Sequence, residues 1–174
     1  MTFMTRLLIG AFAAVFEVVL AAQPVVAEPL APPAGPVVLT VKGAISSTNV
    51  ADTASLDLPL LQSMGTVTIT TTTIWTDGPQ RFEGVSLHNL LAALGAKGTS
   101  VQAMALNDYA VDIPITDAIE GGPILAFRMN DVMLSPRDKG PIWLIYPYDS
   151  NPEYQSEVVY SRSIWQLDRM EVLP

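Results

Sequence analysis

The stretch TVTITTTTIWTDGPQRFEGVSLHNLLAALG, residues 66–95, contains the strongest local structural signals in the chain. Its first part, Thr66–Ile74, is a run of mostly β-branched residues, which favour an extended strand. In Leu87–Leu94 the leucines repeat at i, i+3, i+4 and i+7, and Ser86 and Gly95 are placed to cap and to stop a helix. A strand followed by an amphipathic helix indicates a fold that mixes both elements.

Outward from this stretch, the hydrophobic pattern is one of short strands separated by turn residues. A second short helix is expected at Leu58–Met64, with Asp57 as its N-cap and Gly65 directly after its end. The other expected strands are Val37–Lys42, Val101–Leu106, Ala110–Ile113, Pro123–Met129, Val132–Leu134, Ile142–Pro147 and Ser163–Val172. The pattern predicts an α+β fold, a coiled mixed β-sheet with a few short helices.

Two segments of different composition precede the first strand. In residues 1–27, Arg6 is followed by an apolar run, and Val25 and Ala27 stand where signal peptidase requires small residues. A membrane anchor is the competing interpretation, but its apolar run of about 16 residues is short for a span and is interrupted by Glu17. We expect a signal peptide cleaved near Ala27, a proline-rich and poorly ordered leader at 28–36, and one domain at 37–174.

The composition excludes several classes of function. The chain has no cysteine, so it can form no disulfide, thiolate nucleophile or cysteine-ligated metal site. Its net charge of −8 argues against nucleic acid as a partner, because phosphate binding needs a basic surface. The sole histidine, His88, argues against a zinc or non-haem iron site and against a serine hydrolase triad.

Polar connections between apolar strands are the places where sites usually lie. Asn107–Tyr109 is either a plain turn or a set of hydrogen-bonding groups, and Arg137–Lys139 is either a solvated turn or part of a site. Trp75 follows an apolar strand and is either a stacking platform or the rim of the core. Trp143 and Trp165 stand within predicted strands and are expected in the core.

Three segments, in this order and spacing, resemble the sulfite oxidase-type molybdopterin-binding domain. They are WTDGPQRFEG (75–84) with VSLHNLL (85–91), LNDY (106–109) with VDIP (111–114), and LSPRDKGPIWLIYP (134–147) with SIWQLDRMEV (163–172). The resemblance covers roughly Val37–Val172. It implies the fold of that family, with a pterin-shaped pocket between loops.

In catalytic members of that family, a cysteine after the strand equivalent to Thr66–Ile74 binds the molybdenum of the cofactor. This chain has Thr71–Trp75 there, and a threonine hydroxyl ionises too weakly to replace a soft thiolate. The cations available for the cofactor's phosphate are few, namely Arg81, Arg137, Lys139 and Arg162. We therefore expect no metal, and molybdopterin is the less favoured ligand.

The chain looks more like the small, exported, cysteine-free members of the family. The characterised one is a periplasmic protein that binds a reduced pterin and reports to the periplasmic region of a membrane-bound enzyme of cyclic di-GMP turnover. The resemblance implies a periplasmic regulatory protein with these partners, which favours a binding role over catalysis. The alternative is a molybdopterin-dependent oxidoreductase that lacks the usual cysteine.

A pterin is a flat heterocycle, and its recognition needs an aromatic face, a carboxylate or amide for its amino edge, and further hydrogen-bonding groups. Trp75 is the predicted stacking face, and Asp108 is the predicted acceptor for the amino edge. Arg137 and Lys139 are expected to receive an acidic tail. The full predicted site consists of Trp75, Asn107, Asp108, Tyr109, Arg137, Lys139, Tyr148 and Asp149.

Overall fold

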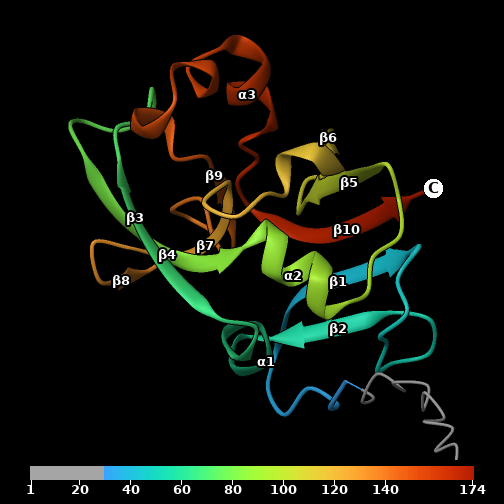
Figure 1. The fold of residues 1–174 in the computed structure, drawn as a ribbon. Coiled ribbons are helices and arrows are strands. Elements are labelled where there is room, and N and C mark those ends of the chain that lie inside the picture. Colours follow the sequence, from blue (N-terminus) through green and yellow to red (C-terminus); the bar gives the residue numbers. More distant parts are fainter. Residues whose placement is uncertain (1–29) are drawn as a thin grey trace, which may run out of the picture.

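The computed structural model describes residues 30–174, whose strands form two five-stranded sheets (Figure 1). The first sheet has the order β2-β1-β10-β5-β6, from β1 (Val37–Gly43), β2 (Ala54–Asp57), β5 (Ser100–Ala105), β6 (Ala110–Pro114) and β10 (Leu167–Leu173). Only its β1–β10 pair is parallel, so this sheet is mixed.

The second sheet is antiparallel throughout and has the order β3-β4-β7-β8, with β9 also paired to β7. Its strands are β3 (Thr66–Thr71), β4 (Gln80–Ser86), β7 (Ile124–Met129), β8 (Val132–Met133) and β9 (Trp143–Ile145). A bridge between Ile142 and Leu167 links the segments that lead into β9 and β10. Residues of both sheets share one hydrophobic core.

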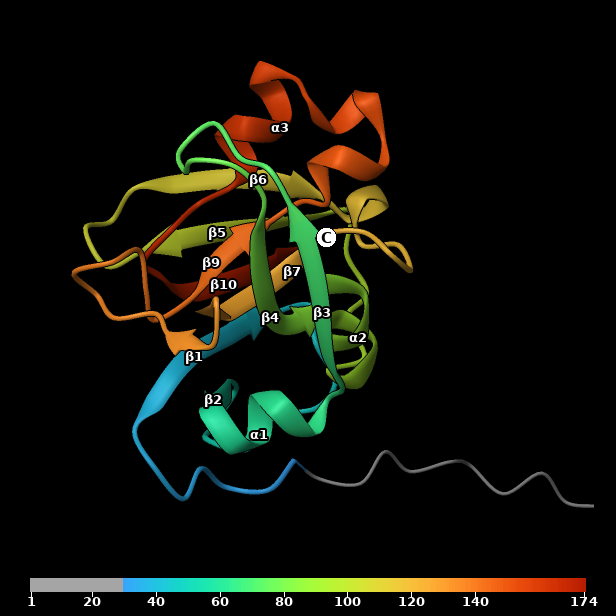
Figure 2. The same cartoon turned by 90° about the vertical axis from the view of Figure 1, so that its left-hand side faces the viewer.

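Both helices expected from the sequence are present. In α1 (Leu58–Ser63), the Asp57 carboxylate accepts a hydrogen bond from the Leu60 amide at 2.9 Å, and in α2 (Leu87–Ala93) the Ser86 hydroxyl accepts from the Asn89 amide. The leucine stripe of α2 is buried, as the spacing of an amphipathic helix leads one to expect. In Figure 2, β4 leads directly into α2.

The main differences from the expected elements are two strand ends and three elements that the sequence analysis did not identify. The β3 strand ends at Thr71 rather than Ile74, and β10 begins at Leu167 rather than Ser163. The sequence analysis did not identify β2, β4 or the third helix, α3 (Glu157–Arg162). Both shortened strands leave their tryptophans, Trp75 and Trp165, in loops.

The described part of the expected leader, residues 30–36, is hydrogen-bonded to the domain. The amides of Ala34 and Gly35 donate to the Asp57 carboxylate at 2.7 and 2.8 Å, and the Asn49 side chain donates to the Ala31 carbonyl at 2.8 Å. Proline-rich composition does not reveal these partners. The expected signal peptide, residues 1–27, lies outside the described residues. No helix within residues 30–174 has the length and apolar character needed to cross a bilayer.

Candidate functional site

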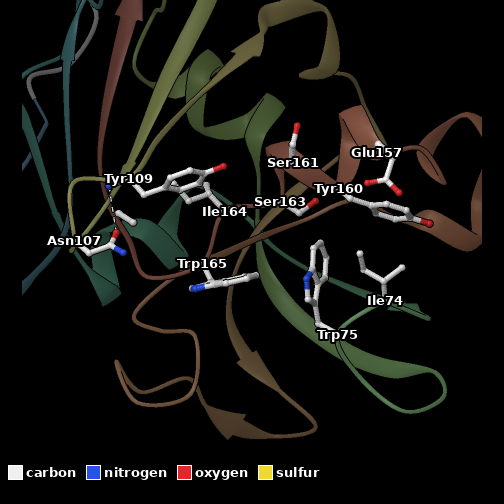
Figure 3. Close-up of a pocket in the computed structure, with 11 residues that line it drawn as sticks. Ile74, Trp75, Asn107, Tyr109, Glu157, Tyr160, Ser161, Ser163, Ile164 and Trp165 are labelled. Atoms are coloured by element: carbon white, nitrogen blue, oxygen red, sulfur yellow. Dashed lines mark hydrogen bonds between the residues drawn. The ribbon is translucent and has the colours of Figure 1, made fainter.

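A pocket of about 420 Å³ opens between two loops and α3. One loop connects β3 to β4 and the other connects β5 to β6, and the segment after α3 completes the lining. Figure 3 shows the side chains around a common hollow, with Asn107 and Tyr109 at one end and Ile74, Glu157 and Tyr160 at the other. The lining residues are Ile74, Trp75, Ala105, Asn107, Tyr109, Glu157, Tyr160, Ser161, Ser163, Ile164 and Trp165.

Trp75 is fixed in the pocket wall by other aromatic rings. Its indole makes edge-on contacts with Trp143, Tyr160 and Trp165 at centroid distances of 5.8, 6.0 and 5.8 Å. Its backbone amide donates to the Thr73 hydroxyl at 3.1 Å. Edge-on packing of this kind is the favoured geometry for aromatic pairs, so the indole is held in one orientation.

Trp165 lies in the pocket wall and not in the core, which corrects the sequence-based expectation. Its side chain is 39% exposed, whereas Trp143 is fully buried as expected. The Lys139 ammonium lies 4.7 Å from the Trp165 ring centroid and 5.3 Å from that of Trp143, within cation–π range. The backbone amide of Gln166 also donates to the backbone carbonyl of Lys139 at 2.9 Å. Lys139 therefore supports the indoles and does not itself line the pocket.

One face of α3 supplies polar groups that the sequence analysis missed. Glu157, Tyr160 and Ser161 stand at i, i+3 and i+4, so they project from the same side of the helix into the pocket wall. The helix is capped by Ser156, whose hydroxyl lies 3.5 Å from the Val159 amide. A serine followed by Glu-Val-Val was the available signal for this helix.

The Asn107–Tyr109 loop divides its side chains between the pocket and the opposite side. Asn107 and Tyr109 line the pocket, and the side-chain Oδ1 of Asn107 accepts a hydrogen bond from the Tyr109 backbone amide at 3.2 Å (Figure 3). Asp108 has a positive φ of 64°, and its carboxylate accepts from the Arg169 guanidinium at 2.9 Å, outside the lining. The role predicted for Asp108 as acceptor for the ligand is therefore not supported by its position. Arg169 is a partner that the sequence analysis did not assign.

Tyr148 lies behind the pocket rather than in it. It is 2% exposed, its ring contacts Trp75 at 6.4 Å, and its hydroxyl lies 2.5 Å from that of Ser163. Burial raises the pKa of Tyr148 to about 12, so the phenol stays neutral. Its position makes it a support for the aromatic wall.

Asp149 and Arg137 also lie outside the pocket lining. The Asp149 carboxylate accepts from both the amide and the hydroxyl of Thr72, at 2.7 and 2.5 Å, and these hydrogen bonds lower its pKa. Asp149 therefore fixes the end of β3, which explains why that strand stops at Thr71. Arg137 is an exposed residue of the turn after β8.

Comparison with known proteins identifies the family to which this fold belongs. The sequence profile of the oxidoreductase molybdopterin-binding domain matches residues 39–149. The chain belongs to this family. Among solved structures, it is similar to the sulfane dehydrogenase SoxCD from Paracoccus pantotrophus, at a TM-score of 0.59 and 18% identity over 79% of this chain. The chain spans 38% of that SoxCD chain, and comparison with curated proteins gave no match in sequence. The predicted sulfite oxidase-type α+β fold is confirmed.

The donor set of this molybdopterin-family domain does not fit the metal of the cofactor. The hydroxyls after β3 are engaged in holding the loop: Thr72 donates to Asp149, and Thr73 shares a 2.8 Å hydrogen bond with Thr76. No thiol exists in the chain, and residues 30–174 contain no cluster of three or more His, Cys, Asp and Glu side chains suited to a metal ion. These neutral hydroxyls are poor ligands for a metal that is bound through soft thiolates.

The residues present do not fit the cofactor's phosphate either. Of the four cations considered for it, Arg81 is paired with Asp131, and Arg162 donates to Asp117 at 2.9 Å. Lys139 lies over the indoles and Arg137 is in the exposed turn. None of the four lines the pocket.

Proposed function

We propose that this protein binds a reduced pterin in the periplasm and acts as a regulatory protein. The observation that carries the proposal is the aromatic pocket between the β3–β4 loop and α3, in a domain of a molybdopterin-binding family that has no thiol. The aromatic rings of Trp75, Trp165 and Tyr160 offer faces and edges to a flat ring, and Asn107 and Glu157 offer hydrogen-bonding groups. A pocket of about 420 Å³ is of the size that small ligands occupy.

A bound ligand without catalytic groups around it needs a second protein that responds to it. We propose that the reader is the periplasmic region of a membrane-bound enzyme that makes or degrades cyclic di-GMP. The sequence resemblance to the small exported members supports this partner. Co-purification with that membrane protein, with and without pterin, tests it, and recovery of no receptor under either condition would contradict it.

The second candidate function is a molybdopterin-dependent oxidoreductase that lacks the usual cysteine. The family profile over residues 39–149 and the fold shared with a sulfane dehydrogenase favour it. The absence of any cysteine disfavours it, since the chain has no thiolate for the metal. Molybdenum content separates the two candidates, as argued in the Discussion.

Anaerobic titration with a reduced pterin tests the proposed function directly. Trp75 and Trp165 both line the pocket, so ligand binding is expected to quench part of the protein's tryptophan fluorescence in a saturable manner. Oxidised pterin and free adenine serve as comparison ligands, and circular dichroism checks that the protein is folded. A folded protein that binds no reduced pterin would overturn the proposal.

A further inference from the structure

The charge of the pocket is unusual for a domain whose family binds a phosphorylated cofactor. Among the described residues that line it, Glu157 is the one charged side chain, and none is arginine, lysine or histidine. Of the nearby cations, Arg169 pairs with Asp108 and Arg162 pairs with Asp117, while Lys139 lies over the Trp165 ring and is not among the lining residues. A ligand in this pocket therefore meets a carboxylate but no cationic side chain in the described lining.

The Glu157 carboxylate is available to a ligand. It is exposed, and among residues 30–174 it takes part in none of the ion pairs. In Figure 3, Glu157 lies beside Tyr160, above Ile74, at the end of the hollow opposite Asn107. The carboxylate thus stands at one end of an aromatic-walled slot, where the edge of a flat ring would meet it.

We infer that Glu157 recognises the amino-pyrimidinone edge of the ligand, and that the absence of a cation from the pocket lining restricts the pocket to pterins that carry no phosphate. This inference rests on the proposed function. The 2-amino group and the neighbouring ring N–H of a pterin are two adjacent donors, and a carboxylate accepts two such hydrogen bonds side by side. A phosphate monoester carries a charge of roughly −1.5 to −2 at pH 7. The phosphorylated side chain lies at the end of a pterin opposite the amino edge, and no described lining residue offers it a cation. The family's phosphorylated cofactor is therefore a poor ligand for this pocket.

A structural role of Glu157 predicts a different result. The residue is in the first turn of α3, where a carboxylate stabilises the helix modestly. Loss of that contribution would lower the melting temperature together with the affinity for every ligand. A role in recognition lowers the affinity for both pterins, which share the amino edge, without that loss of stability.

The experiment is an anaerobic titration of the whole protein with dihydroneopterin and with dihydroneopterin 3′-monophosphate. The parent protein is expected to bind dihydroneopterin at least about tenfold more tightly than its phosphate. Glu157→Gln should weaken the binding of both pterins about tenfold, because both present the same amino edge, and Glu157→Lys should narrow the difference between the two affinities by adding a positive charge. The matched control is Glu153→Gln, because Glu153 is exposed, lies four residues earlier and does not line the pocket.

The possible results distinguish a failure of the inference about Glu157 from a failure of the proposed function. If the phosphate binds as tightly as dihydroneopterin, or if Glu157→Gln leaves both affinities unchanged, the inference about Glu157 is wrong and the proposed function stands. If neither pterin binds to the folded parent protein, the proposed function fails and this inference fails with it. Melting temperatures of all variants show whether a loss of binding reflects unfolding.

Discussion

At the scale of single residues, Trp165 combines an exposed ring with a fixed orientation. It contacts Trp75 edge-on at 5.8 Å, and the Lys139 ammonium lies 4.7 Å from its centroid. A ring held in place before the ligand arrives loses little conformational entropy on binding. The Trp75 ring is also held in place, but it contacts more aromatic neighbours, so its removal disturbs the core as well.

Trp165→Ala is therefore the cleaner test of the aromatic wall. We expect the affinity for reduced pterin to fall about tenfold, because a stacking contact and its buried area are lost. Trp165→Phe, which keeps a ring, should retain most of the affinity. Fluorescence titration measures both variants, and an unchanged affinity of Trp165→Ala would show that the ligand does not contact this wall.

Asp108→Ala is expected to leave pterin affinity within about twofold of the parent value. Its carboxylate is 81% exposed and engaged by Arg169, on a part of the loop that does not line the pocket. This replaces the expectation from sequence that Asp108 accepts from the ligand's amino edge. A tenfold loss in the same titration would show that the carboxylate turns inward when ligand binds.

At the scale of elements, α3 is held to the rest of the domain through Asp117. The Asp117 carboxylate accepts from the Tyr146 hydroxyl at 2.6 Å and from Arg162, the last residue of α3, at 2.9 Å. Burial and the neighbouring carboxylate raise the pKa of Tyr146, so the phenol remains a donor. The side chain of Asp117 is only 17% exposed, so the pair is largely shielded from water.

Asp117→Ala should destabilise the protein by about 1–3 kcal/mol, because two partly buried donors lose their acceptor. Since α3 carries Glu157 and Tyr160, pterin affinity should fall severalfold as well. Urea unfolding and titration measure the two effects. Asp112→Ala, at an exposed position of β6, is the matched control and should alter neither. Equal behaviour of the two variants would contradict this role of Asp117.

The N-cap of α1 predicts a response to acid. Asp57 is 1% exposed, and its carboxylate accepts from the amides of Leu60, Gly35 and Ala34, which lower its pKa below the ordinary value of 3.8. A carboxyl with a lowered folded-state pKa stabilises the fold above the unfolded-state value, and this stability is lost as pH falls through the folded value.

Asp57→Asn is therefore expected to lower the melting temperature at pH 7 but to flatten its fall below about pH 4. Thermal melts followed by circular dichroism between pH 7 and pH 2 measure this. Asp52→Asn, in an exposed turn, should follow the parent curve. If the Asp57 variant keeps the parent's acid dependence, the carboxylate does not anchor α1 and the leader.

Elements defined by neighbouring residues could be predicted from the sequence, and elements defined by distant partners could not. The caps and leucine spacing of α1 and α2 are local, and both helices are found. The end of β3 depends on Asp149, a residue 77 positions from Thr72. In β4, position 84 requires glycine, because a Cβ there would lie 2.2 Å from the Leu125 carbonyl oxygen of β7. That close approach depends on β7, so the sequence alone reads as a turn.

In the candidate site too, only the residues with local signals could be predicted from the sequence. Trp75, Asn107 and Tyr109 were predicted and line the pocket. Glu157, Tyr160 and Trp165 were not, because their segment reads as a polar loop followed by a strand. Their place in the pocket depends on how α3 packs beside the β5–β6 turn, a tertiary contact that hydrophobic periodicity does not encode.

At the scale of the whole molecule, the chain keeps the family's fold while its chemistry differs. It carries a net charge of −8 and has no thiol, and Glu157 is the one charged residue among the described residues that line its pocket. Fold alone does not determine function, so the missing thiol and the missing lining cation weigh more than the shared architecture. The regulatory and catalytic interpretations of the family consequently differ in one measurable quantity, the molybdenum content.

We expect the protein, expressed with its native N-terminus in a host that makes molybdopterin and purified from the periplasm, to contain far less than a stoichiometric amount of molybdenum. The reason is chemical: the loop after β3 offers threonine hydroxyls already engaged by Asp149 and Thr76, and no cation lines the pocket to hold the phosphate. Elemental mass spectrometry measures the content, with a cysteine-containing enzyme of the same family expressed in parallel to show that the host loads the cofactor. Stoichiometric molybdenum in this protein would mean that another ligand set holds the metal, and the oxidoreductase function would then replace the regulatory one.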